Sequence, residues 1–278
     1  MNVLCCRSHR LSLDRPLIMG IVNLTPDSFS GDGLTGDPRV AVGHARRQWE
    51  EGADILDLGA ESSRPGARPA SLAEELARLL PVLEAVTGWG IPVSVDTSKP
   101  EVMKAALAAG AVMINDITAL ANPDALAVVS ASDCGICLMH MQGEPRTMQA
   151  GPVYGDVVAE VAAFLANRVA LCREAGIAES RVVVDPGFGF GKTLEHNLAL
   201  MRALDRLAPV GIPVLAGISR KSMLGTITGR PVGERLASSV AAALLAVERG
   251  ARMVRVHDVA ATKDALAVLA AFKEGEQP

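Results

Sequence analysis

Short apolar runs alternate with helix-forming segments along this 278-residue chain, and this alternation restricts the possible folds more than any other feature of the sequence. The runs are often β-branched, as buried strands are. There are eight of them: Leu17–Val22, Asp54–Leu58, Pro92–Val95, Ala111–Ile114, Gly135–Met139, Arg181–Val184, Ile212–Ala216 and Arg252–Val256. Segments with helical periodicity lie between them, for example Ser71–Val86, Glu101–Ala109, Leu194–Leu207, Glu234–Arg249 and Thr262–Phe272. Alternating strands and helices predict a parallel sheet.

The number of strand–helix units distinguishes between two parallel architectures. Eight units of about 30 residues are typical of a (β/α)8 TIM barrel, whereas an open doubly wound sheet usually has five or six strands. No Gly/Ser-rich linker or charge run interrupts the pattern. We therefore predict an α/β fold, a single-domain TIM barrel over residues 16–278, preceded by an N-terminal extension at residues 1–15.

Composition and charge exclude several classes of protein. The net charge is -4 and the longest basic clusters are dipeptides such as Arg46-Arg47, so a nucleic-acid partner is not expected. No run reaches the roughly 18 apolar residues of a membrane span. Residues 1–15 lack the apolar core of a signal peptide. A cytoplasmic protein with small-molecule partners is expected.

The cysteines do not form an evident framework. The count of five is odd and the residues are scattered, although Cys134-Gly-Ile-Cys137 has the spacing of a redox or zinc pair. There is no second pair to complete a metal site. We expect buried structural thiols.

A glycine-rich loop follows the predicted strand that ends at Asp185. Gly187, Gly189 and Gly191 permit a close approach of the backbone to a ligand. The loop is not a phosphate-binding P-loop, because Pro186 stands where the first glycine is needed, and it does not match the dinucleotide pattern either. A strand-to-helix connection without a ligand remains the alternative.

Polar residues gather at the C-terminal ends of the predicted strands, where barrel enzymes place their chemistry. These ends carry Asn23, Glu61-Ser62-Ser63-Arg64, Asp96, Asn115-Asp116, His140, Asp185, Ser219-Arg220-Lys221-Ser222, Arg255 and His257. Strand side chains alternate between two faces, so Arg255 and His257 share one face and Val254 and Val256 the other. The same parity predicts one shared cavity, surrounded by Asp96, Asn115, Asp185, Lys221, Arg255 and His257.

These residue types suit a nitrogen heterocycle beside an anion. Two carboxylates and an amide match the donors and acceptors of a pterin or purine edge, and Lys221 can contact a ring carbonyl. Arg255 and His257 suit a phosphate group, and Asn23 supplies an oxygen for a hydrated Mg²⁺, which together imply a diphosphate leaving group. For any single aspartate, a helix cap or an ion pair in the core is the alternative. The loops at 23–33 and 61–66 are expected to be mobile lids.

Seven motifs in this order resemble those of the dihydropteroate synthase family. They are MGIVNLTPDSFS (19–30), DLGAESSRPGA (57–67), SVDTSKPEV (94–102), INDI (114–117), VVVDPGFGFGK (182–192), GISRKSMLG (217–225) and RVHDV (255–259). The resemblance implies a TIM-barrel transferase of folate biosynthesis and a sulfonamide target. Such an enzyme condenses 4-aminobenzoate with (7,8-dihydropterin-6-yl)methyl diphosphate, giving 7,8-dihydropteroate and diphosphate. It also implies Mg²⁺ as cofactor and a homodimer.

The resemblance assigns roles residue by residue. It implies pterin binding by Asp96, Asn115, Asp185 and Lys221, further substrate contacts from Met139 and Gly217, and an aminobenzoate side made of Phe29, Ser63, Arg64, Pro65, Phe190 and Ser222. It implies that Asn23 holds the metal and that Arg255 and His257 bind diphosphate, so Asp96, Asp185, Lys221, Arg255 and His257 are expected to be catalytic.

The sequence departs from the family pattern at a few positions. Ala60 and Ser238 each replace a usual glycine, and Ser63 replaces a usual threonine. Two other readings stay open: a pterin-binding methyltransferase barrel that transfers a methyl group to a corrinoid protein, and a paralogue that binds pterin without catalysis. The motifs around Ser219–Ser222 and Arg255–His257 favour the synthase over the methyltransferase.

Overall fold

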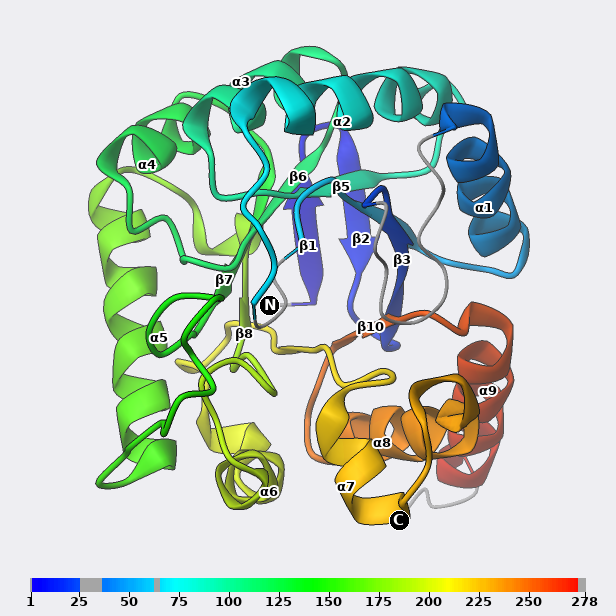
Figure 1. The fold of residues 1–278 in the computed structure, drawn as a ribbon, viewed down its shortest axis with the longest axis vertical. Coiled ribbons are helices and arrows are strands. Elements are labelled where there is room, and N and C mark those ends of the chain that lie inside the picture. Colours follow the sequence, from blue (N-terminus) through cyan, green and yellow to red (C-terminus); the bar gives the residue numbers. More distant parts are fainter. Residues whose placement is uncertain (1, 26–36, 63–65, 275–278) are drawn as a thin grey trace.

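Eight parallel strands form a closed barrel surrounded by helices (Figure 1). The computed structural model describes residues 2–25, 37–62 and 66–274. The barrel strands are β3 (Leu17–Asn23), β4 (Ile55–Gly59), β5 (Val93–Asp96), β6 (Met113–Asp116), β7 (Gly135–Met139), β8 (Val182–Asp185), β9 (Leu215–Ala216) and β10 (Met253–Val256). They pair in the order β8-β7-β6-β5-β4-β3-β10-β9, and a parallel bridge between Val184 and Val214 joins the two ends. The predicted TIM barrel is confirmed, with every strand at its predicted place.

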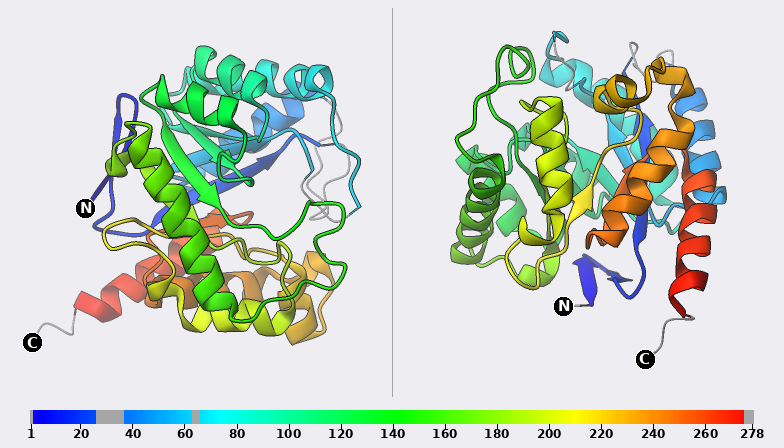
Figure 2. Two further views of the ribbon diagram at one scale, coloured as in Figure 1. Left: turned by 90° about the vertical axis from the view of Figure 1, so that its left-hand side faces the viewer. Right: turned by 90° about the horizontal axis from the view of Figure 1, so that it is seen from below.

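The helices cover the outside of the barrel, as the two further views also show (Figure 2). They are α1 (Pro38–Glu50), α2 (Leu72–Thr87), α3 (Pro100–Ala108), α4 (Pro123–Ser130), α5 (Val157–Glu174), α6 (Leu194–Arg202), α7 (Ser222–Thr228), α8 (Leu236–Glu248) and α9 (Val259–Glu274). Local sequence fixes their starts: Ser71 and Glu74 form a capping box before α2, and Thr193 accepts a hydrogen bond from the His196 amide before α6. The Gly-Lys-Thr sequence therefore opens a helix, as expected.

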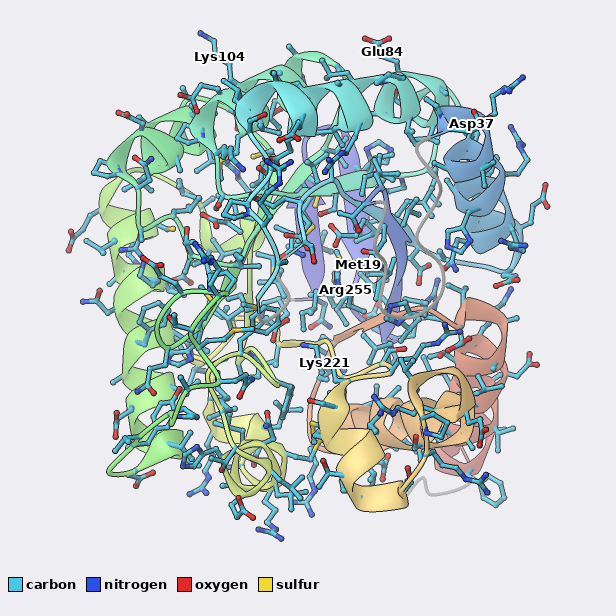
Figure 3. All side chains as sticks on the ribbon, in the orientation of Figure 1. Met19, Asp37, Glu84, Lys104, Lys221 and Arg255 are labelled. Atoms are coloured by element: carbon cyan, nitrogen blue, oxygen red, sulfur yellow. The ribbon has the colours of Figure 1, made fainter. Side chains whose placement is uncertain are left out.

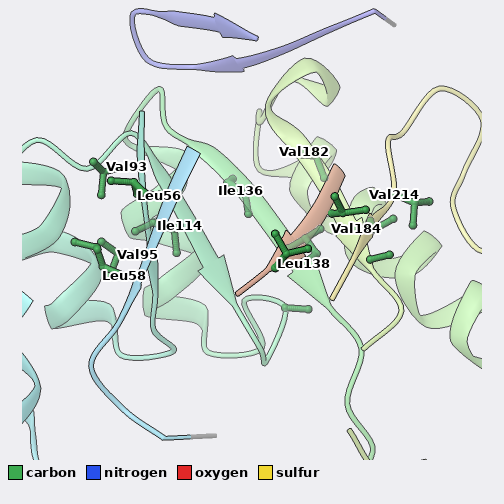
Figure 4. Packing of buried hydrophobic residues seen from close by; sticks show 14 of the residues in the cluster. Leu56, Leu58, Val93, Val95, Ile114, Ile136, Leu138, Val182, Val184 and Val214 are labelled. Atoms are coloured by element: carbon green, nitrogen blue, oxygen red, sulfur yellow. The ribbon is translucent and has the colours of Figure 1, made fainter. Parts of the chain in front are cut away.

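The alternation of strand side chains separates two apolar layers. One set points outward and packs under the helices; Figure 4 shows several of its members, including Leu56, Val95, Ile114 and Val184. The other set fills the barrel interior and consists of Leu17, Met19, Ile55, Met113, Cys137, Val183, Leu215 and Met253. The predicted parity is confirmed, because a strand that buries Val183 inside must present Asp185 at the barrel mouth.

Residues 3–12 form an antiparallel hairpin of β1 (Val3–Cys6) and β2 (His9–Ser12) that closes the opposite end of the barrel. Leu4 and Cys6 are buried together with the interior side chains. A Cβ on Gly135, the first residue of β7, would lie 2.4 Å from the sulfur of Cys6. The N-terminal extension is thus packed into the barrel floor, which the sequence did not predict.

Two further expectations concern membranes and thiols. Within the described residues, no helix is long and apolar enough to cross a membrane. Cys134 and Cys137 are both fully buried and free, in agreement with the structural role expected for them. No group of three or more His, Cys, Asp or Glu side chains in the described ranges is placed to hold a metal ion.

Candidate active site

A cavity of about 400 Å³ opens at the C-terminal ends of the barrel strands. The predicted site residues that the structure describes all line it: Asn23, Asp96, Asn115, Met139, Asp185, Phe190, Gly217, Lys221, Ser222, Arg255 and His257. Figure 3 shows Lys221 and Arg255 directed toward the middle of the barrel, whereas Lys104 and Glu84 point outward. Phe29, Ser63, Arg64 and Pro65 lie outside the described residues, as do residues 26–33 of the first predicted lid loop and 63–65 of the second.

Arg255 connects two aspartates on the cavity floor. Its Nε donates to Oδ2 of Asp57 over 2.6 Å, and its Nη2 donates to Oδ2 of Asp96 over 3.1 Å. The amide of Asn115 also donates to Oδ2 of Asp57, at 3.2 Å. Asp57 has no exposed surface, so its charge depends on these partners. Arg255 therefore neutralises carboxylates in the protein as well as facing the cavity.

A second pair of charged groups lies beside the glycine-rich loop. Oδ1 of Asp185 accepts a hydrogen bond from the Gly187 amide at 2.7 Å, and Lys221 donates to the Phe188 carbonyl at 2.6 Å. A Cβ on Gly217 would lie 3.5 Å from Oδ2 of Asp185 and 3.9 Å from Nζ of Lys221. The missing side chain at Gly217 thus leaves room for a ligand between an anion and a cation.

Comparison with known proteins identifies the family. The family described as pterin binding enzyme matches residues 19–257. The dihydropteroate synthase of Neisseria meningitidis serogroup B is 54% identical over 93% of each chain. The chain belongs to the dihydropteroate synthase family of pterin-binding enzymes.

Solved structures of family members share the fold. The Burkholderia cenocepacia dihydropteroate synthase complexed with 7,8-dihydropteroate superimposes with a TM-score of 0.90 at 51% identity, covering 98% of this chain and 97% of that one. The Yersinia pestis dihydropteroate synthase in a sulfonamide drug complex gives a TM-score of 0.94 at 42% identity, covering 99% and 100%.

The aspartates of this family member have shifted ionisation. Burial raises the pKa of Asp96 to about 7, although Arg255 opposes the rise. Burial also raises the pKa of Asp185, against the effect of Lys221, and lowers the pKa of Lys221 to about 8. In each of the three groups burial disfavours the charged form, so a ligand that pairs with the group can restore its charge.

His257 is held by Ser219, which lies in the loop after strand β9. The Oγ of Ser219 lies 3.0 Å from Nδ1 of His257 and accepts a hydrogen bond from its backbone amide at 3.2 Å. The carbonyl of His257 accepts from Gln48 at 2.8 Å. The imidazole is thereby oriented at the cavity wall, where it can meet an anion.

Asn23 and Asp96 face a common space above Gly59. A Cβ on Gly59 would lie 3.9 Å from Oδ1 of Asn23 and 3.8 Å from Oδ2 of Asp96. Two hard oxygen atoms beside an open cavity are compatible with Mg²⁺, which keeps waters and substrate phosphates among its ligands. The side chains present therefore fit the cofactor that the family resemblance implies.

Two polar residues at the predicted strand ends, Asp116 and His140, do not line the cavity, and one residue beneath it, Asp57, was missed in the sequence. Asp116 accepts hydrogen bonds from Thr118 and Leu120 and caps its own turn, and His140 packs against Lys192 outside the cavity. Asp57 was not among the predicted site residues because it lies inside a strand rather than at its end. Its signal was a carboxylate between two leucines in a strand, a position that normally requires a partner.

Proposed function

We propose that this chain is a dihydropteroate synthase that joins 4-aminobenzoate to (7,8-dihydropterin-6-yl)methyl diphosphate and releases diphosphate. One observation carries the proposal: acceptors and donors suited to a pterin converge with Arg255 and His257 on a single cavity. The high identity to dihydropteroate synthases across nearly the whole chain supports the same reaction.

The pterin ring is proposed to bind between Asp96, Asn115, Asp185 and Lys221. Oδ2 of Asp185 faces the space left by Gly217 and can accept ring N–H groups, while the ammonium of Lys221 can donate to the ring carbonyl. Such charge-assisted hydrogen bonds are each worth about 1.5–3 kcal/mol. Met139 lines the same cavity and offers an apolar surface to the ring.

The diphosphate is proposed to lie toward Arg255 and His257. Two edges of the Arg255 guanidinium are bound to Asp57 and Asp96, and Nη1 makes no hydrogen bond to any residue that the structure describes. That group and the imidazole are therefore placed to receive phosphate oxygens. Asn23 would hold Mg²⁺, which when bound neutralises part of the diphosphate charge.

The substitution at the pterin methylene carbon is proposed to be dissociative. The C–O bond to diphosphate lengthens first and the bonding pair leaves with the diphosphate, while Asp96 and Asp185 stabilise the developing positive charge on the pterin. The aniline nitrogen then forms the new C–N bond and loses one proton to solvent. Fixed charges around the reacting carbon supply the electrostatic stabilisation.

The second substrate is proposed to bind on the side of Phe190 and Ser222, which line the cavity next to Lys221. Nζ of Lys221 lies 4.6 Å from the centre of the Phe190 ring. Phe29, Ser63, Arg64 and Pro65 are proposed to complete this side. Sulfonamide binding at the same place is proposed from the Yersinia pestis complex. A homodimer and a cytoplasmic location are proposed from the family resemblance alone.

The test is to incubate the purified chain with both substrates and Mg²⁺ while following diphosphate release and dihydropteroate formation. A synthase forms both products in equal amounts. A methyltransferase or a pterin-binding paralogue forms neither, so the absence of diphosphate release would reject the proposal.

A further inference from the structure

The glycine-rich loop at 187–191 is held by side chains along its whole length. Each carbonyl accepts a hydrogen bond from a side chain: Gly187 and Phe190 from Lys192, Phe188 from Lys221, Gly189 from Gln149 and Gly191 from Tyr154. Three of its amides are held too, since Gly187 donates to Asp185, Gly189 to Asn197 and Phe190 to the Gly187 carbonyl. Hydrogen bonds to every carbonyl and to three amides favour one defined shape of the loop.

Lys192 makes the largest share of these contacts. Its ammonium lies 2.9 Å from the carbonyl oxygens of Gly187 and Phe190, 3.3 Å from the carbonyl of His140, and 3.0 Å from Nδ1 of His140. Only 3% of Lys192 is exposed, so water cannot replace these partners. When Lys192 is protonated it only donates, so Nδ1 of His140 then accepts and the ring carries its proton on Nε2. Lys192 therefore links the loop to the end of β7.

The loop carries the groups proposed to meet the second substrate. Phe190 is contacted by two lysines: Lys192 donates to its backbone carbonyl, and the ammonium of Lys221 lies over its ring. The Phe188 carbonyl fixes Lys221 in turn. The loop lies closely against its neighbours, and Gly187 and Gly191 both have a positive φ. A Cβ on Gly187 would lie 1.9 Å from the His140 carbonyl oxygen, and a Cβ on Gly191 would lie 2.4 Å from the Gln142 carbonyl oxygen. A small change at Lys192 would therefore displace Phe190.

We propose that Lys192 is a positioning residue for the aminobenzoate side of the reaction, acting through the 187–191 loop on Phe190. This inference rests on the proposed function for the identity of the substrate. Lys192 is not among the residues that line the cavity, so it is expected to act through the loop and not by direct contact with a substrate. The Gly-Lys-Thr sequence is thus explained without a phosphate: its lysine binds backbone carbonyls of the loop that precedes it.

The test compares Lys192→Met, which keeps the length of the side chain and removes the ammonium, with Lys104→Met on the outer surface of α3 as the matched control. We expect Lys192→Met to raise the KM for 4-aminobenzoate about tenfold and the KM for the pterin substrate less than about threefold. In a Phe190→Ala background the same change should have little further effect on the aminobenzoate KM, because the residue it positions is gone. Additive effects in that background, or equal changes in both KM values, would overturn the proposal.

A second measurement does not depend on turnover. Hydrogen exchange of the amides of Gly187, Gly189 and Phe190 should accelerate in Lys192→Met and not in Lys104→Met, while the β1–β2 hairpin stays protected. Unchanged exchange in the loop would reject the positioning role even if the wild-type chain proved inactive as a synthase. If Lys192→Met does not fold, Lys192→Gln keeps two N–H donors and should show the same pattern at smaller amplitude.

Discussion

Arg255 of β10 donates from Nε to the carboxylate of Asp57 on β4 over 2.6 Å, past the one strand, β3, that lies between them. Asp57 is fully buried, and one of its oxygens, Oδ1, has no hydrogen-bond partner among the described residues. The pair therefore places the Arg255 cation at the cavity. Its charge is balanced by the Asp57 carboxylate, which solvent does not reach. We therefore expect stability and ligand binding to depend on the same side chain.

Replacing Asp57 should reveal the cost of leaving Arg255 incompletely paired. Asp57→Asn should lower the free energy of unfolding by about 3 kcal/mol, because breaking a buried ion pair leaves an uncompensated charge. Asp37→Asn is the control: Asp37 caps α1 at the surface and asparagine caps equally well. Urea unfolding of the three proteins measures the difference. Equal stability of Asp57→Asn and the wild type would show that the pair is not needed for stability.

Arg255→Ala should abolish most of the turnover, by a factor of about 100 or more, since both the developing diphosphate charge and Asp96 lose their partner. Arg255→Lys keeps one positive charge but cannot bind both aspartates, so it should retain a small part of the activity. Steady-state kinetics on the folded fraction measures both. Intact turnover in Arg255→Ala would remove Arg255 from the reaction.

The ionisation of Asp96 predicts a pH dependence of stability. Burial raises its pKa to about 7 in the folded chain, so between about pH 4 and pH 7 the folded chain holds a proton that the unfolded chain has released. The resulting stabilisation is complete below pH 4 and is lost as the pH rises through 7. Relative to Asp96→Asn, the wild type should lose roughly 2 kcal/mol of unfolding free energy from pH 5 to pH 8. Parallel pH profiles of the two proteins would contradict this prediction.

The sequence predicted the barrel and most of the described cavity because both follow from strand periodicity. A strand with Val183 inside presents Asp185 at the mouth, and the rule holds without knowledge of tertiary contacts. The periodicity did not predict the pairing of Asp57 with Arg255, the hydrogen bonds from Lys192 to the 187–191 loop, or the hairpin under the barrel. Those depend on contacts between residues far apart in the chain: Asp57 with Arg255, Lys192 with His140, and Cys6 with the space beneath Gly135.

The contact between the hairpin and the barrel floor can be tested at Gly135. Gly135→Ala should lower the free energy of unfolding by about 1–3 kcal/mol, because its Cβ would overlap the Cys6 sulfur. Cys6→Ala in the same chain should remove part of this loss, so the two changes together cost less than their sum. Gly43→Ala is the control; nothing lies within 4 Å of its Cβ in α1, and alanine favours a helix. Additive costs would show that the hairpin moves away without strain.

Gly217 provides a test of the proposed pterin site that should leave the fold intact. A Cβ there would make only ordinary contacts, 3.5 Å to Oδ2 of Asp185 and 3.8 Å to Cβ of Arg255, so Gly217→Ala should change the melting temperature little. It would nevertheless occupy the space between Asp185 and Lys221, and the affinity for the pterin substrate should fall about tenfold. Gly88→Ala, with nothing within 4 Å of its Cβ, is the matched control. Calorimetric titration with the pterin substrate measures the change. Unaltered affinity in Gly217→Ala would place the pterin elsewhere in the cavity, because a ring bound between Asp185 and Lys221 could not avoid the added methyl group.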